Sequence, residues 1–459
     1  MARDLTTGSP MRLIWSFALP TLFGMLFQQF YNMMDTMIVG QLLGASALAS
    51  VGSTSSINFF VIGFCMGVCN GFAIPVAQRM GAGDYSQMRR CVANAGWLSA
   101  LFAVVLTVFT GLFCRTILTV MRTPEDIFDG AYWYILIIFL GIPTTFLYNL
   151  LAAVIRALGD SKTPVYFLAI SSVLNIALDL LLILYCHAGV AGAALATVIS
   201  QGVSGLACLV FMVKRFPILH MTAEERRLDG RTCRTLCLMG IPMGLQYSIT
   251  AIGSIILQSS VNALGSLYVA AVAAGAKLFQ LLACPFDAMG ATMATYCGQN
   301  VGACKLDRLG RGIRSCTALG LGWSLLVLCA MLAFAPQCAM LFLDPSEEQL
   351  ALLVELTARY TVIQVSFYFP LALVNIVRFS IQGMGFSNLA ILAGVMEMFA
   401  RMGVATLLVP AIGYTGACFA SPAAWICADL FLIPASCWSI AHLRRVYGQP
   451  GERSGSPAP

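Results

Sequence analysis

The sequence predicts an all-α polytopic membrane protein with twelve transmembrane helices. Of its 459 residues, 59% are hydrophobic and only 10% are charged, and the mean hydropathy is +0.85. Soluble domains usually carry about 25% charged residues. The apolar blocks run about 20 to 30 residues, which is enough to cross a ~30 Å hydrocarbon core at 1.5 Å per residue. Alternating segments of about ten residues, which would indicate a membrane barrel, are missing from the sequence. Helices are therefore expected.

The apolar blocks and the polar breaks between them define the predicted spans. They cover residues 13–39, 48–77, 91–113, 130–155, 164–186, 190–213, 234–263, 268–297, 314–342, 352–380, 388–410 and 414–442. The N-terminal segment lacks a short apolar core followed by a small-residue cleavage site, so residue 13 onward is expected to form a retained helix.

The basic residues predict the orientation of these spans. Most of the 26 Lys and Arg residues fall in the N-terminal segment, the even-numbered loops and the tail, whereas the odd-numbered loops hold only Arg115 and Arg122. Cytoplasmic loops carry the excess of basic residues in membrane proteins. Both termini are therefore predicted to be cytoplasmic, in a multi-pass protein of the cytoplasmic membrane. The net charge of +6 is explained by this topology, and no nucleic-acid partner is expected.

An internal repeat relates the two halves of the chain. The matching segments are Ala18–Pro20 with Gly240–Pro242, Gly44–Leu48 with Gly265–Val269, Gln78–Ala82 with Gln299–Ala303, and Gly189–Ala193 with Gly413–Ala417. The offset is about 221 to 224 residues, or six spans. Because six is even, the repeat predicts two parallel six-helix bundles related by a pseudo-twofold axis along the membrane normal. A V-shaped central cavity and rocking-bundle alternating access are expected.

The longest polar loop divides the chain into lobes. We predict an N-lobe at residues 1–213, a cytoplasmic linker at 214–233, a C-lobe at 234–442 and a cytoplasmic tail at 443–459. The linker is the natural boundary because domain boundaries fall in exposed polar segments.

A polar stripe marks the first span. Gln28, Asn32 and Asp35 are spaced i, i+4 and i+7, so they share one helical face. A carboxylate facing lipid costs several kcal/mol, so Asp35 is expected to face a partner or a water-filled cavity.

Polar residues on the fifth and sixth spans lie at the depth of Asp35. Counted from the outer ends of their spans, Asp35, Asp179 and Thr197 fall within roughly 5 Å of one depth. Asn175 and Gln201 share helical faces with Asp179 and Thr197, respectively. Two carboxylates, an amide and a hydroxyl could bind a proton or Na⁺. The alternative is that Asp35 and Asp179 line a wet vestibule or hydrogen-bond to neighbouring helices.

The second half lacks an equivalent acidic stripe. Its seventh span carries Gln246 and Tyr247, which could line a substrate cavity. Asp287, toward the cytoplasmic end of the eighth span, could meet a cationic substrate or bond to a helix end. Glu397 and Arg401 are spaced i, i+4 and are expected to form a structural ion pair that cancels two buried charges.

Prolines, glycines and cysteines are assigned structural roles. Pro20 removes a backbone hydrogen bond and could act as a hinge in the first span. Gly63, Gly67 and Gly71 form a small-xxx-small series that predicts close helix packing. The 17 cysteines are scattered through apolar blocks without CxxC pairs or Cys/His clusters, so they are expected to be packing residues. No cofactor and no metal site beyond a possible Na⁺ are expected.

The repeat, the prolines of spans 1 and 7 and the loops at Gln78–Gly83 and Gln299–Gly302 together resemble the multidrug and toxic compound extrusion (MATE) family. Within it, the chain is similar to the DinF-like branch. The cation site of that branch is formed by an Asp on span 1, an Asn and an Asp on span 5, and a Thr on span 6. Asp35, Asn175, Asp179 and Thr197 match these positions. The resemblance implies an antiporter that exports organic cations in exchange for H⁺ or Na⁺, with span 1 bending at Pro20.

Two other functions are weighed against this interpretation. A flippase for lipid-linked precursors or polysaccharides, from the same superfamily, would need several basic residues in its cavity. Arg234, Arg314 and Arg378, at the ends of predicted spans, are assigned to the adjoining cytoplasmic loops, so only Lys277, Arg359 and Arg401 are expected within the membrane. A membrane enzyme would need a catalytic constellation such as HExxH or GxSxG, and the sequence has neither. We therefore expect a non-enzymatic transporter, monomeric in the lipid bilayer.

Overall fold

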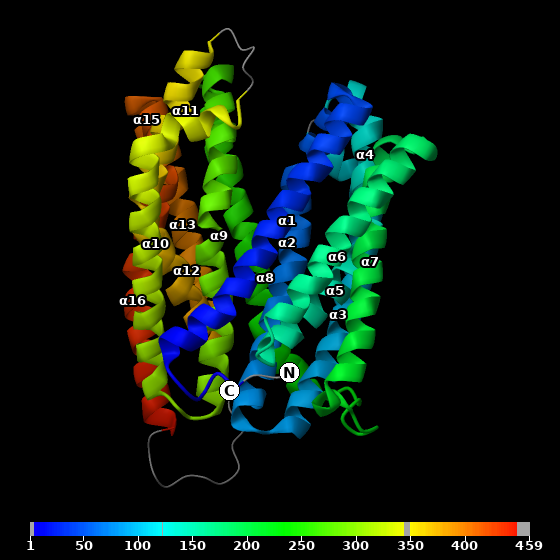
Figure 1. Cartoon of the computed structure of the whole chain (residues 1–459), viewed down its shortest axis with the longest axis vertical. Helices are drawn as coiled ribbons and strands as arrows, with labels where there is room; N and C mark the ends of the chain where they lie inside the picture. Colours follow the sequence, from blue (N-terminus) through cyan, green and yellow to red (C-terminus); the bar gives the residue numbers. More distant parts are fainter. Residues whose placement is uncertain (1–3, 122, 344–348, 448–459) are drawn as a thin grey trace. The chain divides into compact units, whose positions relative to one another are not determined.

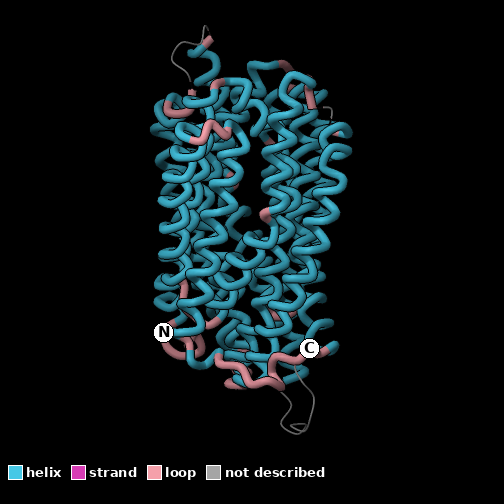
Figure 2. Tube along the Cα trace, turned by 90° about the vertical axis from the view of Figure 1, so that its right-hand side faces the viewer, coloured by secondary structure: helices cyan, strands magenta, loops and turns pink. Residues whose placement is uncertain are grey.

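The computed structural model describes residues 4–121, 123–343 and 349–447. Throughout these ranges the secondary structure is helical and no strand is present (Figure 2). The all-α prediction is therefore confirmed. Arg3, Arg122 and Arg453, which were counted in the charge distribution, and residues 448–459 of the predicted tail lie outside the described residues.

The helices of each half follow one another in the same order (Figure 1). The first half and the loop after it contain α1 (Pro10–Leu43), α2 (Ala45–Ala82), α3 (Tyr85–Val120), α4 (Glu125–Leu140), α5 (Ile142–Ala157), α6 (Lys162–Leu180), η1 (Leu181–Tyr185), α7 (Gly189–Arg215) and η2 (Pro217–Leu219). The second half contains α8 (Gly230–Asn262), α9 (Ser266–Gly302), α10 (Asp307–Met340), α11 (Leu350–Ser366), α12 (Tyr368–Gly383), α13 (Ser387–Gly403), η3 (Val404–Leu408), α14 (Val409–Ile412), α15 (Tyr414–Cys418) and α16 (Ala420–Tyr447).

The span count agrees with twelve when two bent helix pairs are each taken as one span. Among the described residues, ten helical segments are long and apolar enough to cross a membrane. The pairs α4–α5 and α11–α12 pass the same test together, with bends of 47° and 50°. Pro143 and Pro370 lie in the first turns of α5 and α12. Proline removes a helical hydrogen bond and clashes with the preceding turn, which accounts for a break at each place.

The internal repeat is visible in the backbone. Gly44 and Gly265 precede α2 and α9 with φ of 84° and 118°, and Gly189 and Gly413 have φ of 57° and 61° at the matching turn late in each half. Only glycine adopts such angles readily. The π-helical turns η1 and η3 also occupy matching positions. The two bent helix pairs complete the correspondence, so the two halves share one sequence of backbone features.

By their contacts the described residues form two compact units. The first unit includes residues 23–248, and the second includes residues 6–22 and the chain from Ile249 onward. Helices α1 and α8 are thus each divided between the units, at Leu22–Phe23 and at Ser248–Ile249. The lobe boundaries predicted from the polar loop stay a prediction.

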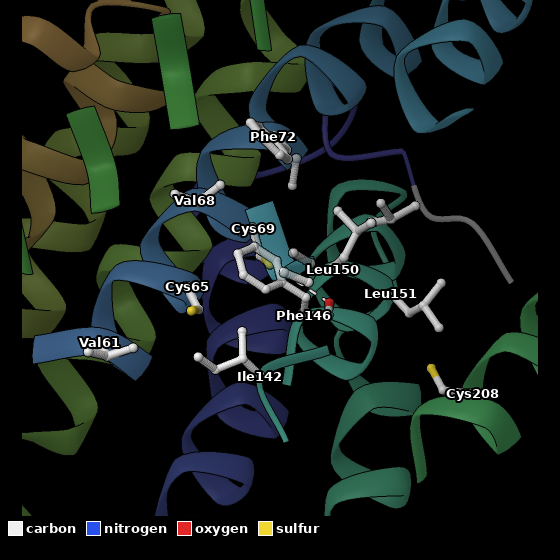
Figure 3. Packing of buried hydrophobic residues seen from close by; sticks show 14 of the residues in the cluster. Val61, Cys65, Val68, Cys69, Phe72, Ile142, Phe146, Leu150, Leu151 and Cys208 are labelled. Carbon is white, nitrogen blue, oxygen red and sulfur yellow. Dashed lines mark hydrogen bonds between the residues drawn. The ribbon is translucent and has the colours of Figure 1, made fainter. Parts of the chain in front are cut away.

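The core of the first unit is a continuous apolar cluster contributed by α2, α3, α4, α5 and α7. Figure 3 shows Cys69 of α2 against Phe146 of α5, where the thiol donates to the Phe146 carbonyl over 3.9 Å. On another face of α2, a Cβ placed at Gly67 or Gly71 would lie 2.5 Å from the backbone of α8. The predicted close packing of the glycine series is therefore confirmed.

The second unit has its own apolar cluster, which joins α8, α9, α11 and α15. Tyr268 and Tyr414 pack against each other there, with their ring centroids 5.1 Å apart. All 17 cysteines lie within the described ranges, and they form no disulfide bonds there. Most of those in the helices are buried, as expected of packing residues.

The polar loop before α8 is folded onto the N-terminal part of α3. Arg89 of α3 donates two hydrogen bonds to the Glu225 carboxylate, of 2.8 and 2.7 Å. Trp97 donates to the Arg226 carbonyl over 3.1 Å. The Arg89 guanidinium, together with the Thr222 backbone N–H and the Ser86 hydroxyl, lowers the pKa of Glu225 to about 2. The loop is thus held to the first unit by charge-assisted hydrogen bonds.

Candidate functional site

Three helices of the first unit bring the predicted cation-site residues together. Asp35 lies on α1, Asn175 and Asp179 lie on α6, and Thr197 lies on α7. Asn175 and Asp179 are four residues apart, so they share one helical face, and both are fully buried at 0% exposure. Helices α6 and α7 run side by side in this unit (Figure 1).

The Thr197 hydroxyl is the centre of the hydrogen bonds in this cluster. It accepts from Asn175 Nδ2 over 3.3 Å and contacts the Tyr31 hydroxyl over 3.2 Å. Its own proton is donated to the Ala193 carbonyl over 3.2 Å. A hydroxyl has one proton and two acceptor positions, so Tyr31 is the donor in the contact with Thr197. The orientation of the Asn175 amide follows, with its nitrogen toward Thr197 and its oxygen free for another ligand.

Four oxygen atoms of the cluster are buried and have no hydrogen-bond partner within the described part of the chain. They are Asp35 Oδ1, Asn175 Oδ1 and both carboxylate oxygens of Asp179. Each unsatisfied buried polar group costs about 1–3 kcal/mol, and a charged one costs more. The Asp35 and Asp179 carboxylates also lie close enough to interact with each other. Such an arrangement is stable when a positive charge binds between the oxygens.

The ligands available at this cluster determine which positive charge fits. All four free atoms are carboxylate or amide oxygens, the ligands that hard cations prefer. The same carboxylates can instead take up protons, because two neighbouring carboxylates cannot both stay ionised at low cost. The π-helical turn η1 begins two residues after Asp179, and π turns occur frequently at functional sites. The chemistry of the cluster thus fits H⁺ or Na⁺.

Two tyrosines complete the cluster and were not selected from the sequence. Tyr31 is four residues before Asp35 on α1, so the same spacing rule that grouped Gln28, Asn32 and Asp35 could have identified it. Tyr134, buried on α4, lies close enough to Asp35 and Asp179 to interact with both electrostatically. Its neighbours Tyr132 and Trp133 are also aromatic, so the sequence offers no signal that separates Tyr134 from an ordinary packing residue.

The polar residues predicted to line a cavity in the first half are placed differently from one another. Asn32 is exposed and Gln28 is partly exposed on α1. Gln201 accepts a hydrogen bond of 2.9 Å from the Thr145 hydroxyl of α5. Gln201 therefore joins α7 to α5, beside the cluster.

The predicted cavity residues of the second half are divided between the two compact units. Gln246 is buried and Tyr247 is partly exposed on the part of α8 that belongs to the first unit. Tyr247 lies against α2, where a Cβ at Gly63 would be 3.3 Å from its side chain. Asp287 lies on α9 in the second unit, and its side chain is exposed.

The predicted ion pair of the second half has a third member. Arg401 lies 3.7 Å from Glu397, as the i, i+4 spacing predicted. Arg378 of α12 also donates a hydrogen bond to Glu397, and this bond is the closer of the two contacts. Assigning Arg378 to a cytoplasmic loop was wrong, because it is buried within α12. Two guanidinium groups thus neutralise the buried Glu397 carboxylate. The Asp35 and Asp179 carboxylates have no such arginine partner among the described residues.

Pro20 lies inside α1, which continues as a helix on both sides of it. The division of α1 between the two units falls at Leu22–Phe23, just after this proline. Proline lacks the N–H that would bond to the carbonyl four residues earlier, so α1 is weakest in this turn. The hinge role of Pro20 stays a prediction.

The repeated membrane-length helices, together with a buried polar cluster within one half, define a membrane transporter. Comparison with known proteins agrees with this class. Residues 20–181 and 242–407 match the family model MatE, so a match falls in each half of the repeat. The chain therefore belongs to the MatE family, whose members are transporters and not enzymes.

The relatives are similar over most of the chain. The Bacillus subtilis protein "Probable multidrug resistance protein YpnP" is 33% identical over 66% of this chain and 67% of its own length. "Probable multidrug resistance protein YoeA" from the same organism is 32% identical over 72% of this chain and 73% of its own length. A crystal structure of MATE in complex with MaL6 has the same fold, with a TM-score of 0.88 over 96% of this chain and 98% of that chain at 22% identity. The predictions of the MATE family and of a non-enzymatic membrane transporter are confirmed.

Proposed function

We propose that this protein is a secondary active antiporter of the cytoplasmic membrane that exports organic cations, including drugs, in exchange for H⁺ or Na⁺. The coupling ion binds at Asp35, Asn175, Asp179 and Thr197. The observation that carries the proposal is the set of four buried oxygen atoms without hydrogen-bond partners among the described residues. A bound cation or protons satisfy these oxygens.

Coupling follows if the affinity of the cluster differs between two conformations of the transporter. The site takes ligands from three helices, α1, α6 and α7. Movement of α1 relative to α6 and α7 would separate Asp35 from Asp179 and weaken ion binding. Pro20 provides the flexible turn for that movement. A ligand shifts a conformational equilibrium only by its differential affinity for the two states, so ion binding and the position of α1 are linked in this proposal.

The substrate class is supported by the relatives and by the exposed polar residues. YpnP and YoeA are named as probable multidrug resistance proteins. Asp287 is an exposed carboxylate on α9, a largely apolar helix, and a carboxylate in this setting suits an organic cation. We assign the chain to the DinF-like branch because Asp35, Asn175, Asp179 and Thr197 match its cation site residue by residue.

A flippase for pyrophosphate-linked lipids is the weaker proposal, because the basic residues of the helices already have partners. Arg378 and Arg401 pair with Glu397, and Arg359 pairs with Glu355 over 3.0 Å. Lys277 alone would be a poor site for a pyrophosphate group.

Transport in proteoliposomes tests the proposed function. The purified chain is reconstituted, a pH gradient and a Na⁺ gradient are imposed separately, and movement of the fluorescent cation ethidium is followed. We expect one gradient to drive ethidium export, and Asp35→Asn and Asp179→Asn to reduce that export to the leak rate. Asp126→Asn is the matched control, because Asp126 is an exposed carboxylate in the first turn of α4. Full gradient-driven export by both site variants, with normal insertion, would refute the assignment.

A further inference from the structure

A surface groove in the first unit lies between α6 and α7, on a side of these helices away from the cation cluster. Its volume is about 680 Å³. Phe167 of α6 forms one wall, and the remaining lining residues come from the last three turns of α7. Those residues are Leu206, Ala207, Val210, Phe211, Lys214 and Arg215. The groove is thus apolar along most of its length and basic at one end.

Packed aromatic rings form part of the apolar wall of the groove. Phe167 and Phe211 meet edge to face, with ring centroids 5.5 Å apart, and Phe211 packs against Phe216 in the same way at 6.3 Å. Leu206 and Val210 remain 58% and 53% exposed beside them. An elongated apolar ligand can therefore lie along α7 without displacing these side chains.

The basic end of the groove has two positively charged side chains without an acidic partner in the described part of the chain. Lys214 and Arg215 are exposed in the last turn of α7, and neither forms an ion pair within the described ranges. Lys162, also exposed, begins α6 at the same end, because α6 and α7 are consecutive antiparallel spans. This basic end is complementary to an anionic headgroup.

The length of the groove matches one leaflet of a bilayer. Leu206 and Arg215 are nine residues apart on α7, or about 14 Å at 1.5 Å per residue. Half of a ~30 Å hydrocarbon core is about 15 Å. An acyl chain that begins at Lys214 and Arg215 would therefore end near Leu206, close to the middle of the membrane.

We propose that this groove binds an anionic phospholipid. One acyl chain lies along Phe167, Leu206 and Val210, and the phosphate is held by Lys214 and Arg215. The predicted orientation of the chain places this lipid in the cytoplasmic leaflet. The site is separate from the proposed ion coupling, because it uses the opposite end of α7 from Thr197.

Competitive lipid binding to the full chain tests this site. The purified, delipidated protein is exposed to an equal mixture of phosphatidylglycerol and phosphatidylcholine in detergent, and retained lipid is counted by native mass spectrometry. Each Lys or Arg near a membrane surface contributes about 1 kcal/mol toward an anionic lipid, so we expect Lys214→Ala/Arg215→Ala to reduce the preference for phosphatidylglycerol about 30-fold.

Two further variants separate the headgroup from the groove. Arg444→Ala/Arg445→Ala removes two charges from the last turn of α16, the last helix of the second half, where Arg444 pairs with Asp307 over 3.3 Å. This control should keep the preference. Ala207→Trp fills the groove and should abolish retention of the tightly held lipid whatever its headgroup. An unchanged preference in Lys214→Ala/Arg215→Ala, or an equal loss in the α16 control, would overturn the proposal and leave only non-selective contact with bulk lipid.

Discussion

The two halves of this transporter share their backbone features but differ in the charge of their buried polar clusters. In the first half, α6 is followed by the π turn η1 and then by Gly189 with positive φ; in the second, α13 is followed by η3 and Gly413. The first cluster has two carboxylates, Asp35 and Asp179, with unpartnered oxygens. In the second cluster, Glu397 is bound by two arginines.

This difference shows that the repeat conserves geometry while the chemistry of each half is set by a few side chains. Arg378 and Arg401 neutralise Glu397 within the protein, so the second cluster needs no added cation. Arg378 also interacts with Asp429 of α16. Among the described residues, no arginine forms an ion pair with Asp35 or Asp179, so in the proposed function the positive charge comes from solution. We therefore expect reversible ion binding in the first half and a permanent structural role for the cluster of the second.

Removing Arg378 should have the largest effect, because it would leave the second cluster with excess negative charge, as in the first cluster. We expect Arg378→Ala to lower the free energy of unfolding by about 3–5 kcal/mol, the usual cost of breaking a buried ion pair. Thermal unfolding in detergent measures the loss. Arg359→Ala, which breaks the exposed pair with Glu355, should cost less than about 1 kcal/mol. Equal losses in the two variants would show that the Glu397 cluster is not a structural element.

The close contact of α2 with α8 is a second difference between the halves. At the repeat offset of 221 residues, Gly67 of α2 corresponds to Ala288 of α9. A Cβ at Gly67 would lie 2.5 Å from the Met243 carbonyl oxygen, so Gly67→Ala must separate the two backbones. We expect a loss of about 1–3 kcal/mol in thermal unfolding experiments. Gly96→Ala is the control, since no atom lies within 4 Å of that Cβ, and it should not destabilise the protein. A neutral Gly67→Ala would contradict the packing described here.

Tyr31→Phe tests the contribution of one hydroxyl group to the proposed ion site. It removes the hydroxyl that donates to Thr197 while keeping the ring, so we expect a loss of only about 0.5–1.5 kcal/mol in unfolding free energy. Gradient-driven ethidium export should fall by a factor of about 2 to 10, because that energy also positions Thr197 and Asn175. Tyr166→Phe, at a 67% exposed position on α6, should leave both measurements unchanged. A full transport rate in Tyr31→Phe would exclude Tyr31 from the site.

The polar linker joins the two halves and is not repeated within them. The pH dependence of its attachment to α3 should be the smallest of the predicted effects. The pKa of Glu225 is lowered from 4.5 to about 2 by Arg89, Thr222 and Ser86. A carboxyl whose pKa is lower in the folded state stabilises that state above its unfolded pKa, and this stabilisation is lost as the pH falls through the folded value. Protease cleavage of the linker should therefore increase as the pH falls from about 4.5 toward 2.

Substitution of Glu225 separates this effect from general acid unfolding. Glu225→Gln should make the linker sensitive to protease already at pH 7, measured with an acid-stable and a neutral protease in parallel. Glu224→Gln is the matched control, because Glu224 is exposed beside it. Identical cleavage of the wild-type and Glu225→Gln proteins at pH 7 would show that the Arg89–Glu225 contact does not hold the linker.

The fold could be predicted because membrane spans and repeats leave strong signals in the sequence. Apolar length sets the spans, and the Gly44 and Gly265 matches reflect a backbone conformation that other residues adopt with difficulty. The bends at α4–α5 and α11–α12 were not predicted, because Pro143 and Pro370 lie within otherwise uninterrupted apolar blocks and proline is common in transmembrane helices.

The site could be predicted in part, where spacing along one helix carries the information. Asn175 with Asp179, and Glu397 with Arg401, are i, i+4 pairs, so helical geometry alone places each pair on one face. Tyr134 and Arg378 join their clusters from other helices, and no periodicity connects them to their partners. Arg378 was also misplaced because a basic residue near the end of a span resembles the start of a cytoplasmic loop.

One measurement tests most directly whether ion coupling resides in the first half. Asp179→Asn and Asp429→Asn each remove one buried carboxylate, from α6 and from α16. Both proteins are reconstituted, and ethidium export is measured under the gradient that drives the wild-type protein. We predict that Asp179→Asn loses gradient-driven export while Asp429→Asn keeps it. Loss of export in Asp429→Asn together with normal export in Asp179→Asn would contradict the account.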